Sequence, residues 1–336
     1  MMKPVRRLAY PSHSVQQRGF ALLLVLWILS LLTIMAGSFA LTIRRESAIV
    51  AGLKDNAQAA AVAESGLAIA QVMLLNNDKT KRWVANGSIY SLNDWQQLGV
   101  ENAHVRLRIF DEKGKIDINK ASQQVLASLM SASPLTNERD QLRLVGAILD
   151  WRDKDDIPSN DGAEKDQYSQ QGLNYVPRNK AFQSINELKL LIGMNDTVYN
   201  WLSPLVTVFS GQPKVDMRVA TKDVLQVLPE LDQATINDFV IARLENLKQG
   251  LPPPNLPLEA TGSAPPSGEQ QLGTVTIIAE AFIDEGGSAV IKAVLRSSGM
   301  TQPFQIFDWQ RNTLATDSLF GDQVGVSTLH ELLVYE

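Results

Sequence analysis

The sequence contains no cysteine and only three histidines, and positive charge is not in excess. Without cysteine, disulfides, thiolate metal sites and a cysteine nucleophile are excluded. No two histidines have the spacing of a zinc-binding motif, which argues against histidine-bound zinc. Because 31 Lys and Arg face 36 Asp and Glu, the chain has no surplus cation to neutralise phosphates, and bulk nucleic-acid binding is not expected. The 336 residues are enough for two or three domains.

An uncharged apolar run extends from Phe20 to Ile43. As a helix its 24 residues would be about 36 Å long, enough to cross a hydrocarbon core of about 30 Å. Basic residues precede the run at Lys3, Arg6, Arg7 and Arg18, and two basic residues follow it, partly offset by Glu46. This asymmetry predicts a single-pass protein of the inner membrane, with a cytoplasmic N-terminus and a translocated periplasmic body. A plain anchor and a cleaved secretory signal, with a small-residue site at Ser38–Ala40, are the alternatives.

The junction Gln17-Arg18-Gly19-Phe20 resembles the leader of type IV prepilin-like proteins. The resemblance implies that prepilin peptidase cuts between Gly19 and Phe20, that residues 1–19 are the leader, and that Phe20 becomes N-methylated. Most members of that class carry Glu at the fifth mature position, where this chain has Leu24. Within the class, this departure is typical of the subunit at the filament tip. Loss of the leader would change the formal charge from −5 to −9.

The pattern after the apolar run predicts an α+β, pilin-like fold: one long N-terminal helix on a small antiparallel sheet. Residues 20–43 form the membrane part, and residues 44–119 continue the helix to about Leu75 and add the first strands. His104–Phe110 alternates as a half-buried strand, with Lys115–Ile118 as its expected hairpin partner. Further strands are expected at 206–209 and within 274–336, after a proline-rich loop at 251–273.

Between the strands lies a helical block with an internal repeat. Residues 116–129 match residues 215–228 at a constant offset of 99, with Ser122 and Thr221 placed to cap the helices after them. Each unit, 120–205 and 206–250, resembles helix-hairpin-helix or SAM-like folds, with second helices expected at Gln141–Arg152 and Gln233–Glu245. The turns lack the paired glycines of DNA-binding hairpins, so protein packing is expected instead of contact with nucleic acid.

The first unit contains an acidic segment, residues 150–166, with seven carboxylates against three basic groups in 17 residues. Such crowded carboxylates repel one another, and a hard cation would relieve the repulsion, since Ca²⁺ binds six to eight oxygens. The alternative is a solvated acidic loop. The candidate ligands, of which a subset is expected to bind, are Asp150, Asp153, Asp155, Asp156, Asp161, Glu164 and Asp166.

Together these features resemble the minor pseudopilin K family of type II secretion systems. The resemblance depends on the leader, on Gly114–Ala121, on Asp150–Tyr168 and on the stretch that begins at Phe182. It implies a non-enzymatic subunit that caps a periplasmic pseudopilus with pseudopilins I and J, and with H as a further candidate. It also implies contacts with the inner-membrane assembly platform, with prepilin peptidase and with membrane lipid before extraction, and one or two calcium ions in the helical block.

Two rival functions use the same features. A minor pilin of a type IV pilus would share the motif Ala61–Gly66, but the long helical insertion counts against it. A membrane-anchored DNA receptor would use the helix-hairpin-helix units, but the acidic balance of charge counts against that.

Overall fold

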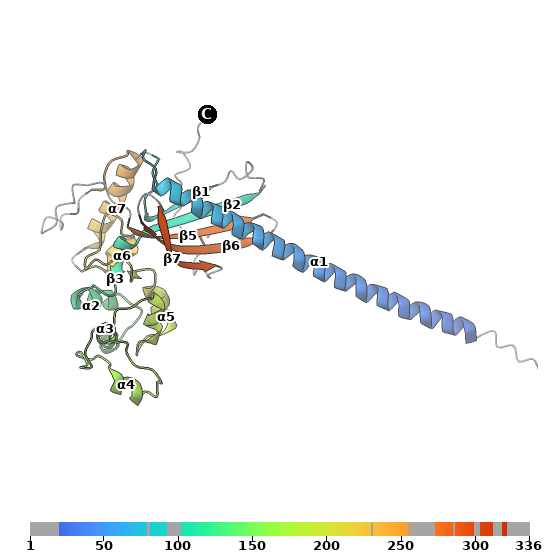
Figure 1. The fold of residues 1–336 in the computed structure, drawn as a ribbon, viewed down its shortest axis with the longest axis horizontal. Helices are drawn as coiled ribbons and strands as arrows, with labels where there is room; N and C mark the ends of the chain where they lie inside the picture. Colours follow the sequence, from blue (N-terminus) through green and yellow to red (C-terminus); the bar gives the residue numbers. More distant parts are fainter. Residues whose placement is uncertain are drawn as a thin grey trace, which may run out of the picture. The chain divides into compact units, whose positions relative to one another are not determined.

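The computed structural model describes residues 20–78, 81–92, 102–229, 231–254, 256, 273–284, 286–298, 303–311 and 318–320. The expected leader, including Gly19, lies outside these residues, as do most of the proline-rich loop and the C-terminal tail. The chain divides into two compact units, Met1–Lys54 and Asp55–Glu336. Figure 1 shows its elements coloured along the sequence.

Helix α1 spans Phe20–Leu74, as the apolar run and the alanine-rich segment after it predict. All side chains from residue 20 to residue 54 are exposed. By length and composition, α1 is the one helix among the described residues that could cross a membrane.

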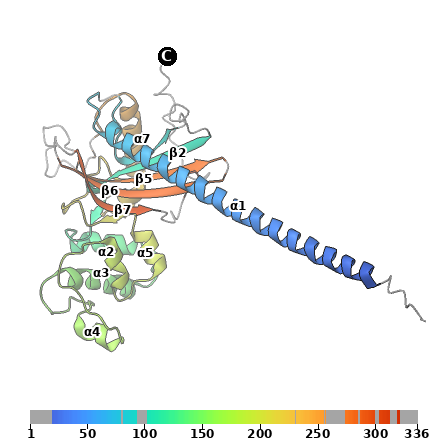
Figure 2. The ribbon, with the colours of Figure 1, turned by 45° about the vertical axis from the view of Figure 1, so that its right-hand side comes forward.

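From residue 55 onward, one face of α1 packs on the sheet (Figure 2). Its buried residues are Ala59, Val62, Ala63, Gly66, Leu67, Ala70 and Leu74. The helix approaches the sheet so closely that a Cβ at Gly66 would lie 2.8 Å from Val105 Cγ1. Glycine is therefore favoured at position 66 of α1, because a side chain there would push the helix away from the sheet.

The sheet has five antiparallel strands in the order β1-β2-β5-β6-β7. Their bounds are β1 Asn86–Leu92, β2 Ala103–Asp111, β5 Thr274–Ile283, β6 Ser288–Ser297 and β7 Phe304–Arg311. Val105, Leu107 and Ile109 of β2 are fully buried, which confirms the alternation seen in the sequence. Strand β1 was not expected, because it begins with Asn86-Gly87, which is typical of a turn; its register to β2 shifts between Asn86 and Ile89.

The helical segments lie between β2 and β5 in the chain. They are η2 Glu112–Gly114, α2 Gln123–Ser131, α3 Glu138–Arg152, α4 Lys165–Gln170, η3 Ile185–Leu190, α5 Asp196–Leu202, α6 Lys222–Val227 and α7 Gln233–Lys248, with short strands β3 Ile116–Asp117 and β4 Val206–Thr207. We call residues 112–248 the helical block. The predicted hairpin of Lys115–Ile118 with the preceding strand is wrong, because Ile116 pairs in parallel with Val206. Local alternation marked this strand but not its distant partner.

The two units of the repeat have matching hydrogen bonds. Ser122 caps α2 by accepting from Val125 N at 3.3 Å, and Thr221 caps α6 by accepting from Val224 N at 3.4 Å. Each unit also has an arginine on its second helix that donates to two carbonyls of the repeated segment. Arg152 of α3 donates to Ile118 O and Ala121 O, and Arg243 of α7 donates to Met217 O and Ala220 O.

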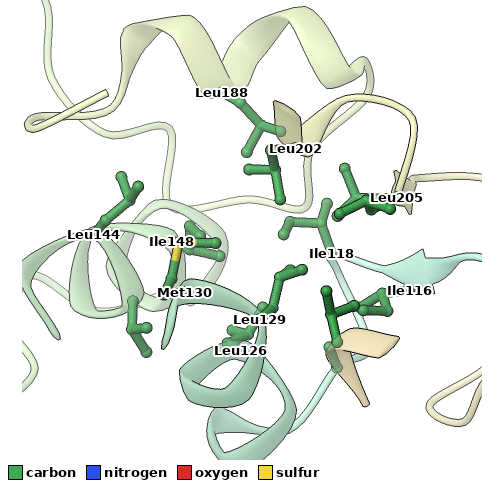
Figure 3. Packing of buried hydrophobic residues seen from close by; sticks show 14 of the residues in the cluster. Ile116, Ile118, Leu126, Leu129, Met130, Leu144, Ile148, Leu188, Leu202 and Leu205 are labelled. Atoms are coloured by element: carbon green, nitrogen blue, oxygen red, sulfur yellow. The ribbon is translucent and has the colours of Figure 1, made fainter. Parts of the chain in front are cut away.

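The helical block has its own hydrophobic core, distinct from the one between α1 and the sheet. Figure 3 shows side chains from α2, α3, η3, α5 and β3 meeting in it, among them Leu129, Met130, Ile148 and Leu188. Ile148 and Leu188 are each 0% exposed. This core holds the buried face of α3, whose C-terminal end leads into the acidic segment. The likeness of the units to helix-hairpin-helix or SAM-like folds stays a prediction.

Candidate metal centre

The acidic segment starts on the buried face of α3. The helix begins after Asn137, whose side chain accepts from Arg139 N at 3.0 Å. Leu144, Val145, Ile148 and Trp151 are buried in the core of the block. Asp150 lies on the same helix and is also 0% exposed. A carboxylate is thus held by the helix where a side chain normally has to be apolar or paired.

The chain beyond α3 folds back over this helix. Asp150 Oδ1 accepts from Ser159 N at 2.9 Å. A Cβ at Gly162 would lie 2.0 Å from Asp150 Oδ2, and a Cβ at Gly146 would lie 2.6 Å from Gly162 Cα. Two glycines therefore permit the returning chain to lie directly against Asp150.

Several buried oxygens in this place have no hydrogen-bond partner. They are Asp150 Oδ2, Asp153 Oδ1, both carboxylate oxygens of Glu164, and Asn179 Oδ1. Among the described residues, the only other buried side-chain atom without a partner is Arg243 Nε. Because native proteins pair almost all buried polar atoms with protein groups, water or ligands, these oxygens make this place the candidate site for a bound cation.

The carboxylates in the cluster repel one another. Burial, together with the charges of Asp150, Asp153, Asp156 and Asp155, raises the pKa of Glu164 to about 7. Burial, followed by the charges of Asp155 and Asp150, also raises the pKa of Asp153. The protein alone therefore disfavours full ionisation of the cluster, and a nearby cation would favour it.

The remaining predicted ligands lie at the surface. Asp155 Oδ1 accepts from Ile157 N at 3.0 Å, and Asp156 Oδ1 accepts from Asn179 Nδ2 at 2.7 Å. Asp161 has a left-handed backbone, with φ 58°, and its side chain is exposed. Asp166 is exposed in the first turn of α4. The structure thus buries Asp150 and Glu164 and leaves Asp153 half-buried, with Asp155 and Asp156 near them.

Asn179 was missed by the sequence reasoning, because it lies 13 residues beyond the acidic segment in the chain. Its neighbours hold it firmly: Lys180 N donates to Trp151 O at 3.2 Å, and Arg178 donates to Glu187 Oε1 at 3.0 Å. Glu187 also accepts from Trp151 Nε1 at 3.2 Å. This network fixes the loop of Asn179 against the end of α3. The Asn179 amide nitrogen donates to Asp155 O and Asp156 Oδ1, while its Oδ1 is buried without a partner.

Carboxylate and amide oxygens are the ligands that a hard cation such as Ca²⁺ prefers. Among the described residues, no group of three or more acidic or histidine side chains is arranged so that these side chains alone could hold a metal ion. Calcium does not require such a set, since carbonyl oxygens and water complete its coordination. The donor types and the unpaired buried oxygens therefore fit calcium.

Comparison with known proteins matches residues 92–211 to the family model of type II secretion system protein K. The chain is 28% identical over 215 residues to type II secretion system protein K of Klebsiella pneumoniae, covering 59% of this chain and 64% of that protein, just under two thirds of its length. It is 25% identical over 287 residues to the protein of the same name from Pectobacterium carotovorum, covering 78% of this chain and 85% of that one.

The chain is thus similar to type II secretion system protein K, over residues 92–211 in the family model and over most of its length in the Pectobacterium protein. By their names, these relatives are components of a type II secretion system. A solved structure, titled as the GspK-GspI-GspJ complex of enterotoxigenic Escherichia coli, is similar with a TM-score of 0.47 and 13% identity, covering 80% of this chain and 99% of that one. The apolar helix at the N-terminus fits a single-pass anchor of such a component.

Proposed function

We propose that this chain is a minor pseudopilin that caps the periplasmic pseudopilus of a type II secretion system and supports its assembly and protein export. Similarity to type II secretion system protein K is the observation that carries the proposal. The exposed apolar helix of residues 20–54 supports it, because this surface can pack against lipid first and against sibling helices later. Leu24 at the fifth mature position suits a subunit that has no neighbour above it.

Maturation and partners belong to the same proposal. Prepilin peptidase would cut between Gly19 and Phe20, and Phe20 would be N-methylated. The body would lie in the periplasm, anchored in the inner membrane until the assembly platform extracts the helix. Pseudopilins I and J, and H as a further candidate, would join it at the tip. Before extraction, membrane lipid would cover residues 20–43.

The N-terminus of membrane-purified protein tests this proposal. Mass spectrometry should find an N-methylated Phe20, and Gly19→Val should leave the leader in place and stop secretion in a strain whose only copy is this gene. Asp238→Asn, at an exposed position of α7, is the control, and it should secrete normally. A mature chain that starts at Met1, or one that has lost the apolar run, would contradict the proposal.

Calcium is the second part of the proposal. Asp150, Asp153, Glu164 and Asn179 would hold the ion, with Asp155, Asp156, Asp161 and Asp166 as further candidate ligands from the same segment. The ion would supply positive charge to buried oxygens that have no partner. Its effect would be structural: it would fix the chain that returns over α3.

Thermal melting of the full chain in detergent tests the calcium proposal. Excess Ca²⁺ should raise the melting temperature above that in chelator, because a ligand bound only by the folded state stabilises it. Asp150→Asn should abolish most of this increase. Asp238→Asn, at an exposed position of α7 outside the acidic segment, is the control and should keep it. Equal melting temperatures with Ca²⁺ and with chelator would remove calcium from the proposal but leave the capping role intact.

A further inference from the structure

Glu112 lies where the chain leaves the sheet and enters the helical block. It is the first residue after β2 and the first of η2. Although charged, it is 1% exposed. Its Oε1 accepts from Lys115 Nζ at 2.6 Å and from Thr276 Oγ1 at 2.7 Å, and its Oε2 accepts from the hydroxyl of Thr207. One buried carboxylate therefore has three donors.

The two threonines belong to different parts of the molecule. Thr276 is on β5, a central strand of the sheet, and is 2% exposed. Thr207 is on β4 of the helical block and is 0% exposed. Thr207 Oγ1 also accepts from Phe209 N at 3.0 Å, which leaves its hydroxyl hydrogen for Glu112. Glu112 Oε2 thus bonds Thr207 of the helical block, and Glu112 Oε1 bonds Thr276 of the sheet as well as Lys115.

The electrostatics keep this carboxylate ionised. Burial raises the pKa of Glu112, but the charge of Lys115 and the hydrogen bonds from Lys115, Thr207 and Thr276 outweigh burial, so the pKa lies below its ordinary value. An ionised buried carboxylate that loses a donor stays unpaired, because water does not reach it. Movement of Thr207 away from Thr276 would therefore be opposed directly by Glu112.

The chain packs closely around Glu112. A Cβ at Gly114 would lie 2.7 Å from Val219 O, and Lys113 O accepts from Asp216 N at 2.8 Å. The start of the second repeat thus covers η2. Farther out, Phe209 of the block meets Phe307 of β7 at a ring distance of 6.2 Å.

We propose that Glu112 is a polar latch that fixes the helical block to the sheet, so that the two unfold and move as one body instead of as domains on a hinge. The latch goes beyond the capping role, because it is a property of the fold. Through it, a force that acts on the helical block is transmitted to the sheet on which α1 packs. It does not depend on calcium or on any partner.

A double-mutant cycle on the full chain in detergent tests the latch. Thr207→Val and Thr276→Val each remove one donor, and their effects on the unfolding equilibrium constant should be non-additive by a factor of about 2 or more, as for residues in one hydrogen-bond network. In a Glu112→Gln background the coupling should disappear. The control pair is Thr207→Val with Thr274→Val; Thr274 is also buried on β5 but bonds Arg296, and this pair should be additive.

Hydrogen exchange gives a second readout. In the unaltered chain, the amides of β3–β4 and of β5 should exchange at a common slow rate, through global unfolding. In Glu112→Gln, β3–β4 should exchange at least about tenfold faster than β5. Additive effects of the two threonine substitutions in the unaltered background would overturn the latch. If Glu112→Gln does not fold, the threonine cycle alone decides.

Discussion

The two repeated units of the helical block differ mainly in the path of the chain beyond their second helix. In both, an arginine donates to carbonyls of the preceding segment: Arg152 in the first unit and Arg243 in the second. In the first unit α3 ends at Arg152, and the chain folds back as the acidic segment. In the second unit α7 continues past Arg243 to Lys248. The same arrangement of two helices and an arginine thus carries a candidate metal centre in the first unit and only a longer helix in the second.

Aligning the two arginines shows how the difference arises. Two residues before each arginine are Asp150 and Ile241; Asp150 is 0% exposed and Ile241 is 56% exposed. Six residues before each arginine are Gly146 and Asn237. The first unit therefore has a glycine where its returning chain crosses the helix, and a carboxylate beneath that chain. The second unit has neither and leaves the same helix face open.

The largest effect is expected from Gly146→Ala. Its Cβ would lie 2.6 Å from Gly162 Cα and 2.7 Å from Gly162 N, so the backbone of the acidic segment must move. We expect a loss of about 3 kcal/mol in the free energy of unfolding, at the upper end of overpacking effects, and loss of the calcium response. Urea unfolding and melting with Ca²⁺ measure both.

The matched control is Asn237→Ala in the second unit, which should change stability by less than about 0.5 kcal/mol. Alanine is a better helix former than glycine by up to about 1 kcal/mol. A neutral or stabilising Gly146→Ala would therefore mean that the acidic segment does not lie against α3.

The next largest losses in the free energy of unfolding are expected from substitution of the two arginines. Arg243 is 6% exposed and donates to three carbonyls, those of Met217, Arg218 and Ala220. Arg243→Met should cost about 2 kcal/mol, because these buried acceptors lose their donor. Arg152 is only half-buried and donates to two carbonyls, so Arg152→Met should cost about 1 kcal/mol. Chemical unfolding of both variants measures the ranking, and a larger effect at Arg152 would contradict it.

The sequence predicted the repeat but not these arginines, for a physical reason. The first helices match at an offset of 99, but the arginines are 91 residues apart. Three differences produce this shift: α2 has nine residues and α6 has six. The connection to the second helix is one residue longer in the first unit, and Arg152 lies four residues farther into α3 than Arg243 lies into α7. A search at constant offset therefore misses the match.

Helix α1 teaches a similar lesson. Its extent was predicted, because a long run without proline and rich in alanine favours one helix. Its apolar stripe predicts the buried face only in part: Ala63 and Leu67 are buried, but Ile49, Leu53 and Val72 of the same stripe are 62%, 65% and 69% exposed. Hydrophobicity also does not mark Gly66, which is needed where the helix lies closest to the sheet. In the acidic segment, composition located the cluster, but only the fold separates buried Asp150 and Glu164 from exposed Asp161 and Asp166.

A pH titration in chelator separates the two units further. The pKa of Glu164 is raised to about 7 from 4.5, so its contribution to stability is fully present below pH 4.5 and is lost as the pH rises through about 7. In chelator, the free energy of unfolding should fall by roughly 1 to 2 kcal/mol between pH 5 and pH 8. Glu164→Gln should remove this part of the pH dependence. An unchanged slope in that variant would show that Glu164 is not the titrating group.

The smallest effect is expected where the two units are most alike. Ser122 and Thr221 each accept from the backbone N–H three residues on, at 3.3 Å and 3.4 Å. Ser122→Ala and Thr221→Ala should each cost about 1 kcal/mol, the usual loss for an N-cap. Chemical unfolding at constant calcium should give the same value for both within about 0.5 kcal/mol, since neither cap touches the acidic segment.

Ser122→Gly should recover most of the loss, because glycine is tolerated at an N-cap. A much larger loss in the free energy of unfolding for Ser122→Ala alone would mean that the acidic segment contacts the start of α2 as well as α3. The stability of the first unit would then depend on a contact that the second unit lacks.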